Sequence, residues 1–295
     1  MDAQQLPVIF FALGANLSFA LGSQVFTHYS RAVNPAWMNA VKAIVALVCF
    51  ILINLFFVPQ VSTSVVTILV LGISGFIGLG FGDIFLLRSF AELGPGRTLM
   101  LFSFQPLILG FFSYFLFDQG VDTRKFWAIL FFVLCVFLFS FESFQKSRKW
   151  QMAPIMLAFS GILLDACGVL MSRWSFNSTP ELGSLQGNLY RTFGAVLFYL
   201  ILGMKGRFQL RNLWKARSTK DKGYLIIGSF LGTFLSLSLY LNAIRLGHLA
   251  TISGLSITGV LFSSLFECLI EKKWPSRYFM TAFCAFLIGM KFLLF

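Results

Sequence analysis

The sequence contains roughly ten apolar runs of ~20 residues, the length that a helix needs to cross the hydrocarbon core of a bilayer. The links between the runs are mostly short, and the chain is 58% hydrophobic and only 12% charged. Soluble domains carry about twice that charged share. The composition therefore excludes a soluble globule and leaves no stretch for a soluble domain. The runs centre on Ala15, Leu47, Gly75, Ile108, Leu134, Leu163, Leu197, Leu231, Leu261 and Leu287.

These runs predict helices and not the strands of a membrane barrel. Segments such as 126–141 are continuously apolar, whereas barrel strands alternate polar and apolar residues over about ten positions. A helix satisfies its own backbone hydrogen bonds inside lipid. We therefore expect an all-α integral membrane protein with about ten transmembrane helices.

The chain shows signs of an internal duplication, which divides it into residues 1–145 and 146–295. An odd number of spans in each half inverts the second half relative to the first, as in many transporters. We therefore predict two inverted five-helix repeats, with a substrate site near the middle of the membrane where they meet. The matching positions are Pro7 with Pro154, Gly14 with Gly161, Asn39 with Asn188, Lys42 with Arg191, Gly75 with Gly228, Leu93-Gly94 with Leu246-Gly247, Asp118 with Glu271, and Phe126 with Phe279.

The net charge of +12 is spread unevenly over the links. When links are assigned alternately to the two sides of the membrane, most of the 23 Lys and Arg fall on one side. The positive-inside rule places that side in the cytoplasm and both termini outside. The basic link 205–222 belongs to this side, and we interpret it as a topology signal near anionic lipid headgroups, not as a nucleic-acid site.

Two basic residues, Lys42 and Arg191, lie inside apolar runs, each three positions after an asparagine (Asn39 and Asn188). That spacing puts both groups on one helix face. Three interpretations are open: snorkelling to the interface, a salt bridge, or a cationic wall for an anionic group of a substrate.

Two carboxylates, Asp83 and Asp165, also lie in apolar runs. A charge in lipid must face a partner or an aqueous cavity. Both are therefore candidate ion-pair partners for the buried cations, and Asp83 is also a candidate proton carrier.

Several neutral polar side chains fall within the runs, where they either hydrogen-bond a substrate or tie helices together. Tyr190 and Tyr199 are expected to be interfacial anchors. These neutral residues are Asn16, Gln24, Gln105, Tyr240 and Asn242. The substrate-binding residues that we predict are Asn16, Asn39, Lys42, Gln105, Asn188, Arg191, Tyr240 and Asn242.

Nothing in the sequence points to an enzyme. The glycine-rich stretches do not follow a strand, so they are not a nucleotide-binding fingerprint. The five cysteines are irregularly spaced and lie in or beside apolar runs, which argues against a zinc site. We expect no catalytic residues, no metal and no cofactor.

The chain resembles the drug/metabolite transporter superfamily, in particular its ten-span EamA-type members. The resemblance rests on Lys42 and Arg191, on the turn from Ser89 to Gly96 followed by Pro106 and Asp118, and on the turn from Asn242 to Gly247 followed by Glu271. Gly259 stands where the second half would repeat the proline. The resemblance implies cytoplasmic termini, whereas the charge distribution implies the opposite.

We expect a secondary active transporter that exports small metabolites such as amino acids across the bacterial inner membrane by alternating access. Its partners would be the substrate, protons as a coupling ion and the lipid bilayer, in a monomer or homodimer without nucleic acid. One alternative is an exchanger of phosphorylated compounds such as nucleotide sugars. Another is an integral-membrane enzyme or scaffold that transports nothing.

Overall fold

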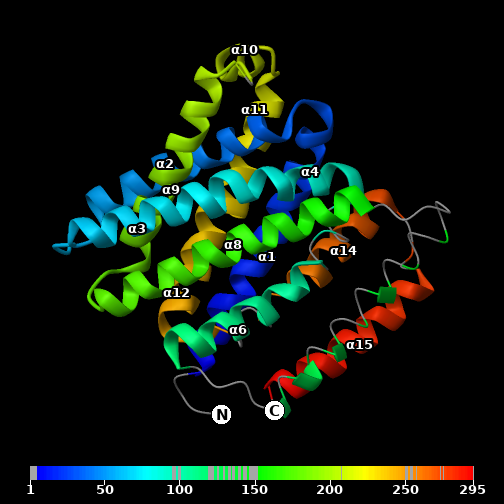
Figure 1. Cartoon of the computed structure of the whole chain (residues 1–295). Coiled ribbons are helices and arrows are strands. Elements are labelled where there is room, and N and C mark those ends of the chain that lie inside the picture. The colour runs from blue at the N-terminus through cyan, green and yellow to red at the C-terminus, as the bar shows by residue number, and fades with distance from the viewer. Residues whose placement is uncertain are drawn as a thin grey trace.

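The computed structural model of the chain describes residues 5–94, 98, 101–118, 152–206, 208–249, 258–272, 274 and 276–294, with single positions between 123 and 145 and at 252, 255 and 256. The regular structure of these residues is helical throughout (Figure 1). Each predicted apolar run coincides with a helix, apart from the run centred on Leu134, which lies largely outside the described residues. The prediction of an all-helical membrane protein is confirmed.

The first half begins with two long helices joined by a tight turn at Asn34. The side chain of Asn34 accepts hydrogen bonds from the backbone N–H groups of Ala36 and Trp37, and Pro35 occupies the first helical position, where its missing N–H costs nothing. The elements of this half are α1 (Gln5–Ala32), α2 (Pro35–Phe56), α3 (Val65–Gly75), η1 (Phe76–Gly82), α4 (Asp83–Leu93), η2 (Phe102–Phe104) and α6 (Gln105–Phe117).

The second half runs in the same order of long and interrupted helices and adds a short helix, α10, in the basic link. The elements of this half are α8 (Met152–Ser178), α9 (Ser184–Met204), α10 (Leu210–Lys215), α11 (Thr219–Ser229), η3 (Phe230–Leu235), α12 (Ser236–Leu246), α14 (Thr258–Glu271) and α15 (Arg277–Leu294).

Within the described residues, five helical stretches are long and apolar enough to cross a membrane. Two of them, Val65–Leu93 and Thr219–Leu246, are composite, because η1 and η3 continue α3 into α4 and α11 into α12. The predicted spans near Ile108, Leu261 and Leu287 correspond to shorter apolar helices. Helix α6 is short because it starts at Gln105-Pro106 and ends at Asp118, which has a left-handed backbone (φ 52°).

The two interruptions are π-helical and lie at equivalent positions of the two halves. When Gly75 is placed on Gly228, η1 falls on η3 and Asp83 falls on Ser236, the first residue after each π segment. A π turn adds a residue to the helix and so changes the direction of the side chains that follow; such turns are frequent at functional sites. Both interruptions adjoin the centre of the bundle.

The two halves pack reciprocally. Helix α1 contacts η3, α12 and α14 of the second half, and α8 contacts η1, α4 and α6 of the first. Thus the first helix of each half packs against the third and fourth apolar segments of the other, as expected for repeats related by a two-fold axis. The proposed boundary after residue 145 adjoins residues outside those described.

Glycines permit the closest helix contacts. A Cβ atom built on Gly75 would lie 1.8 Å from the carbonyl oxygen of Arg191, and one on Gly22 would lie 2.4 Å from the Cα of Gly232. At both crossings the backbones touch directly, which is how small residues allow tight packing of membrane helices.

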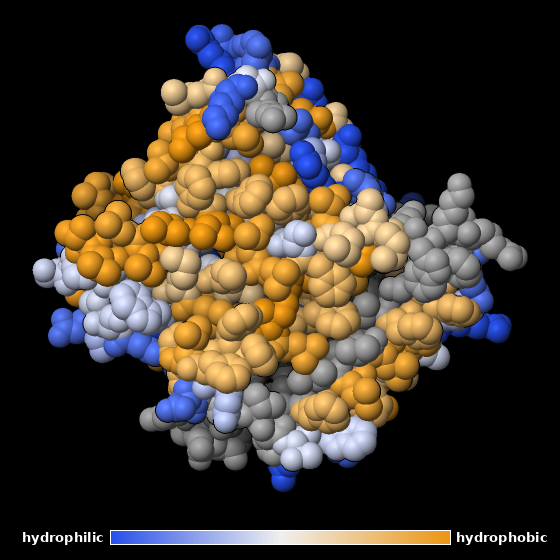
Figure 2. Space-filling model, viewed as in Figure 1, coloured by the Kyte–Doolittle hydropathy of each residue, from blue (hydrophilic) through white to orange (hydrophobic). Residues whose placement is uncertain are grey.

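The outer surface is strongly apolar. Leu55, Phe56, Val65 and Phe115 are among many large hydrophobic side chains that are more than half exposed. Figure 2 shows that such residues form a broad zone over the helices, with hydrophilic residues gathered near α10 and α11. A soluble monomer does not expose so much contiguous apolar surface, whereas a bilayer covers it.

Candidate functional site

A cavity of about 120 Å³ lies where the two halves meet. Residues of both halves line it, so neither half forms the cavity alone. Its apolar lining includes Phe19, Leu79, Leu86, Phe102 and Leu237. Its polar lining consists of Asn16, Lys42, Asp83, Gln105, Asp165, Thr233, Ser236, Tyr240 and Ser256.

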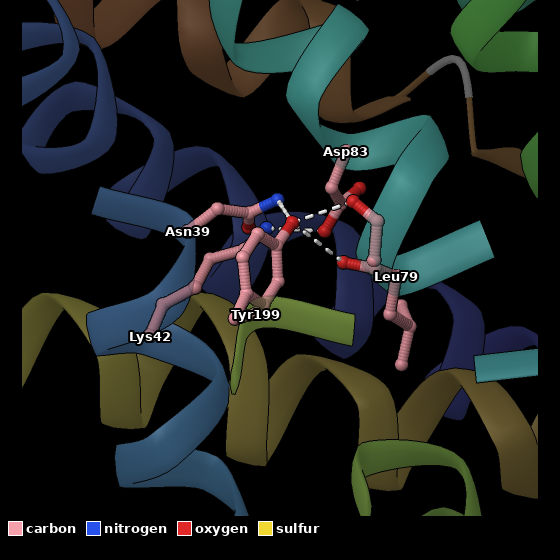
Figure 3. A network of polar contacts seen from close by, with 6 residues as sticks. Asn39, Lys42, Leu79, Asp83 and Tyr199 are labelled. Atoms are coloured by element: carbon pink, nitrogen blue, oxygen red, sulfur yellow. Dashed lines mark hydrogen bonds and ion pairs between the residues drawn. The ribbon is translucent and has the colours of Figure 1, made fainter. Parts of the chain in front are cut away.

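A direct ion pair joins two helices at this cavity. Lys42 Nζ of α2 lies 2.5 Å from Asp83 Oδ2 at the start of α4, and only 4% and 11% of the two side chains are exposed (Figure 3). The Lys42 ammonium also lies 5.2 Å from the ring centre of Phe26, within cation–π range. Removing one partner would leave a buried charge uncompensated, so the pair holds α2 and α4 together.

The second carboxylate, Asp165 of α8, has a different partner. Gln105 Nε2, at the start of α6, donates a hydrogen bond of 2.5 Å to Asp165 Oδ2. Asp165 is half-buried and lines the cavity. Its charge is therefore met by a neutral amide, not by a direct cation.

Arg191 of α9 lies behind the cavity and is not among its lining residues. It is only 1% exposed, and its Nε donates to Ser74 Oγ over 3.0 Å. The guanidinium interacts electrostatically with Asp165 and Asp83, but the described residues place no carboxylate in direct ion-pair contact with it. Its Nη1 is buried without a hydrogen-bond partner.

A polar network around Tyr199 supports the π segment beside the ion pair. The Tyr199 hydroxyl donates to Gly80 O at 2.5 Å and also lies 3.4 Å from Leu79 O, while Asn39 Nδ2 donates to the Tyr199 hydroxyl (Figure 3). Tyr199 is 2% exposed, so the expectation that it anchors at the membrane interface is wrong. Because Asn39 and Lys42 share one face of α2, the same face reaches both Tyr199 and Asp83.

Some of the remaining candidates line the cavity, and the others form hydrogen bonds away from it. Asn16 and Tyr240 line the cavity, and Asn16 Nδ2 donates to Leu255 O (2.8 Å) and Thr258 Oγ1 (3.1 Å). Asn188 Nδ2 donates to Leu237 O over 2.8 Å, and Asn242 Nδ2 donates to Ser238 O over 3.0 Å. Asn188 thus joins α9 to α12, Asn242 bonds within α12, and neither lines the cavity; Gln24 is bonded to Ser263.

Two of these contacts are equivalent in the duplication. The alignment that places Gly75 on Gly228 also places Gln105 on Thr258. Gln105 bonds Asp165 in the first helix of the second half, and Thr258 accepts from Asn16 in the first helix of the first half. The halves therefore use the same helix crossings, but only one of them contributes a carboxylate there.

An apolar helical bundle with an ionic cavity between its two halves defines a multi-pass membrane protein. No group of three or more His, Cys, Asp or Glu residues is assembled for a metal in the part of the chain that the structure covers.

Comparison with known proteins gives a family match for the first half of the chain. Residues 6–141 match the EamA-like transporter family. One protein of known crystal structure superimposes with a TM-score of 0.70 over 97% of this chain and 95% of its own, at 12% identity. That likeness shows a shared fold. The comparison with curated proteins found no match.

Proposed function

We propose that this protein is a secondary active transporter that exports a small metabolite across the bacterial inner membrane by alternating access. The observation that carries the proposal is the cavity between the halves, which holds Lys42, Asp83 and Asp165 within an apolar bundle. Charged groups in a membrane core are costly, and they are typical of solute or ion pathways. The match of residues 6–141 to a family of transporters favours transport over an enzymatic role.

The cavity favours one substrate class over another. An exchanger of phosphorylated compounds needs cations that are free to bind phosphate. Lys42 is already paired with Asp83, and Arg191 lies outside the cavity lining. We therefore propose a substrate without a phosphate, held mainly by Asn16, Gln105, Asp165 and Tyr240, with Asn39, Asn188 and Arg191 supporting the helices.

Coupling to protons is assigned to the two carboxylates. Asp83 would take up a proton from one side of the membrane and release it to the other, with Lys42 as its neighbour, and Asp165 would do the same beside Gln105. If Asp83 carries the proton, Asp83→Asn should lose uptake driven by a pH gradient but keep substrate exchange. Unchanged proton-driven uptake in this variant would assign the role elsewhere.

The test of the function combines binding and transport. Metabolites are screened for thermal stabilisation of the purified protein, because a ligand that binds only the folded state raises its stability. Stabilising compounds are then tested for counterflow in proteoliposomes. We expect labelled compound to enter only when unlabelled compound is present inside. Binding without any such movement would favour a scaffold or an enzyme.

A further inference from the structure

The described side chains that line the cavity include more acidic than basic groups. Among the described lining residues, Asp83 and Asp165 are acidic and Lys42 is basic. Lys42 and Asp83 are matched within one ion pair at 2.5 Å and leave little of either side chain exposed. The remaining charge of the lining is the carboxylate of Asp165.

The described residues leave one carboxylate oxygen of Asp165 without a hydrogen-bond donor. Gln105 donates to Oδ2, and no described residue donates to Oδ1. Oδ1 lies beside the π segment η1, since a Cβ built on Gly78 would be 3.6 Å from it. The Arg191 guanidinium acts on Asp165 electrostatically, and no ion pair joins them among the described residues; its Nε is bonded to Ser74. Asp165 therefore lines the cavity with only one of its two carboxylate oxygens hydrogen-bonded by a described residue, and the one cation of the described lining, Lys42, is already paired.

We propose that Asp165 binds a cationic nitrogen of the substrate, so that the transported compound is an amine with an apolar body. A charge-assisted hydrogen bond from an ammonium to a carboxylate is short and strong. The apolar body would lie against Phe19, Phe102 and Leu237. The inference names the substrate class of the proposed transporter and in that sense rests on the proposed function.

The same geometry disfavours substrates with a carboxylate. A second charged group entering the cavity must lose its water, and that loss is compensated only by a partner of opposite charge. Lys42 can serve only by leaving Asp83. We therefore expect an amine to bind more tightly than the amino acid with the same side chain, and a carboxylic acid without the amine to bind least.

The test uses three probes with one body: isoamylamine, leucine and isocaproate. Each is titrated into the purified, full-length protein, and the shift in unfolding temperature gives its affinity. Isoamylamine should bind most tightly. Asp165→Asn should weaken isoamylamine binding about tenfold to a hundredfold, as expected for the loss of a hydrogen bond to a charged group. Asp165→Glu should retain most of it.

Two further variants complete the test: a matched control, and a variant expected to bind the carboxylate probe more tightly. Asp118→Asn makes the same chemical change at an exposed residue whose left-handed backbone asparagine tolerates, so amine binding should not change. Asp83→Asn frees Lys42, and this variant should gain affinity for isocaproate. The proposal is overturned if isoamylamine gives no shift, if leucine or isocaproate binds more tightly, or if Asp165→Asn leaves amine binding intact.

The two claims fail separately. Asp165-dependent amine binding without counterflow in proteoliposomes would support the binding site and refute the transport function. Counterflow of another compound, together with no response to isoamylamine, would support transport and refute the amine site.

Discussion

At the scale of single residues, the Lys42–Asp83 pair is a buried contact whose partners depend on each other. Either Lys42→Met or Asp83→Asn leaves one group unpaired, and we expect each to lower the free energy of unfolding by about 3–5 kcal/mol. The double variant should recover most of the loss. Thermal unfolding in detergent measures all three. Lys220→Met, at an exposed position, should stay within about 0.5 kcal/mol of wild type. Additive losses would show that the pair is not coupled.

Tyr199 gives a second prediction at this scale. Tyr199→Phe keeps the ring but removes the donor to the buried carbonyl of Gly80. An unsatisfied buried acceptor costs about 1–3 kcal/mol, and we expect that loss in the free energy of unfolding. Tyr114→Phe removes a hydroxyl from a side chain that is half exposed and should have little effect. Equal stability of both variants would mean that the Tyr199 hydroxyl does not support the π segment.

The sequence predicted part of this site. Lys42, Asp83 and Asp165 were recognisable because a charge within an apolar run is rare and needs a partner. Their distinct roles were not recognisable, since the pairing depends on which helices meet. Tyr199 was misplaced because a tyrosine near the end of an apolar run is typical of the interface, and only the fold shows that it turns inward to Gly80.

At the scale of helices, close packing between α3 and α9 requires that Gly75 has no side chain, whereas Gly72 has room for one. Gly75→Ala would place a methyl group 1.8 Å from Arg191 O, whereas Gly72→Ala, one turn earlier on α3, would meet nothing within 4 Å. We expect Gly75→Ala to lower the unfolding temperature strongly. Gly72→Ala should be neutral or should stabilise by about 1 kcal/mol, because alanine favours helix. Similar behaviour of the two variants would contradict the crossing.

The π segments could not be predicted from the sequence. The apolar runs at 65–93 and 219–246 predict long helices, and both are long helices. The backbone register inside them follows from packing at the centre of the bundle, where η1 meets α8 and α9 and η3 meets α1 and α2. Glycines such as Gly78 and Gly232 permit that packing, but their spacing does not encode an i→i+5 hydrogen bond.

At the scale of the whole molecule, the charge distribution predicts an orientation. In Figure 1 the basic link that carries α10 lies at the opposite end of the bundle from the start of α1 and the end of α15. The positive-inside rule then places α10 in the cytoplasm. Arg211→Cys, at an exposed site on α10, should resist an impermeant thiol reagent in intact cells.

Ser62→Cys, in the exposed link between α2 and α3, is the control and should be labelled in the same cells. Wild-type protein corrects for its own cysteines. The reverse pattern, with Arg211→Cys labelled and Ser62→Cys protected, would invert the orientation without changing the fold.

The most direct test of alternating access uses a cysteine inside the cavity. Ser236 lines the cavity and is the second-half counterpart of Asp83. We expect Ser236→Cys to react with an impermeant thiol reagent added to right-side-out vesicles, which expose the outer side of the membrane. It should also react with reagent added to inverted vesicles, which expose the cytoplasmic side, because one cavity opens to each side in turn. A stabilising ligand should slow both reactions. Reaction in only one of the two vesicle preparations, at every ligand concentration, would contradict alternating access.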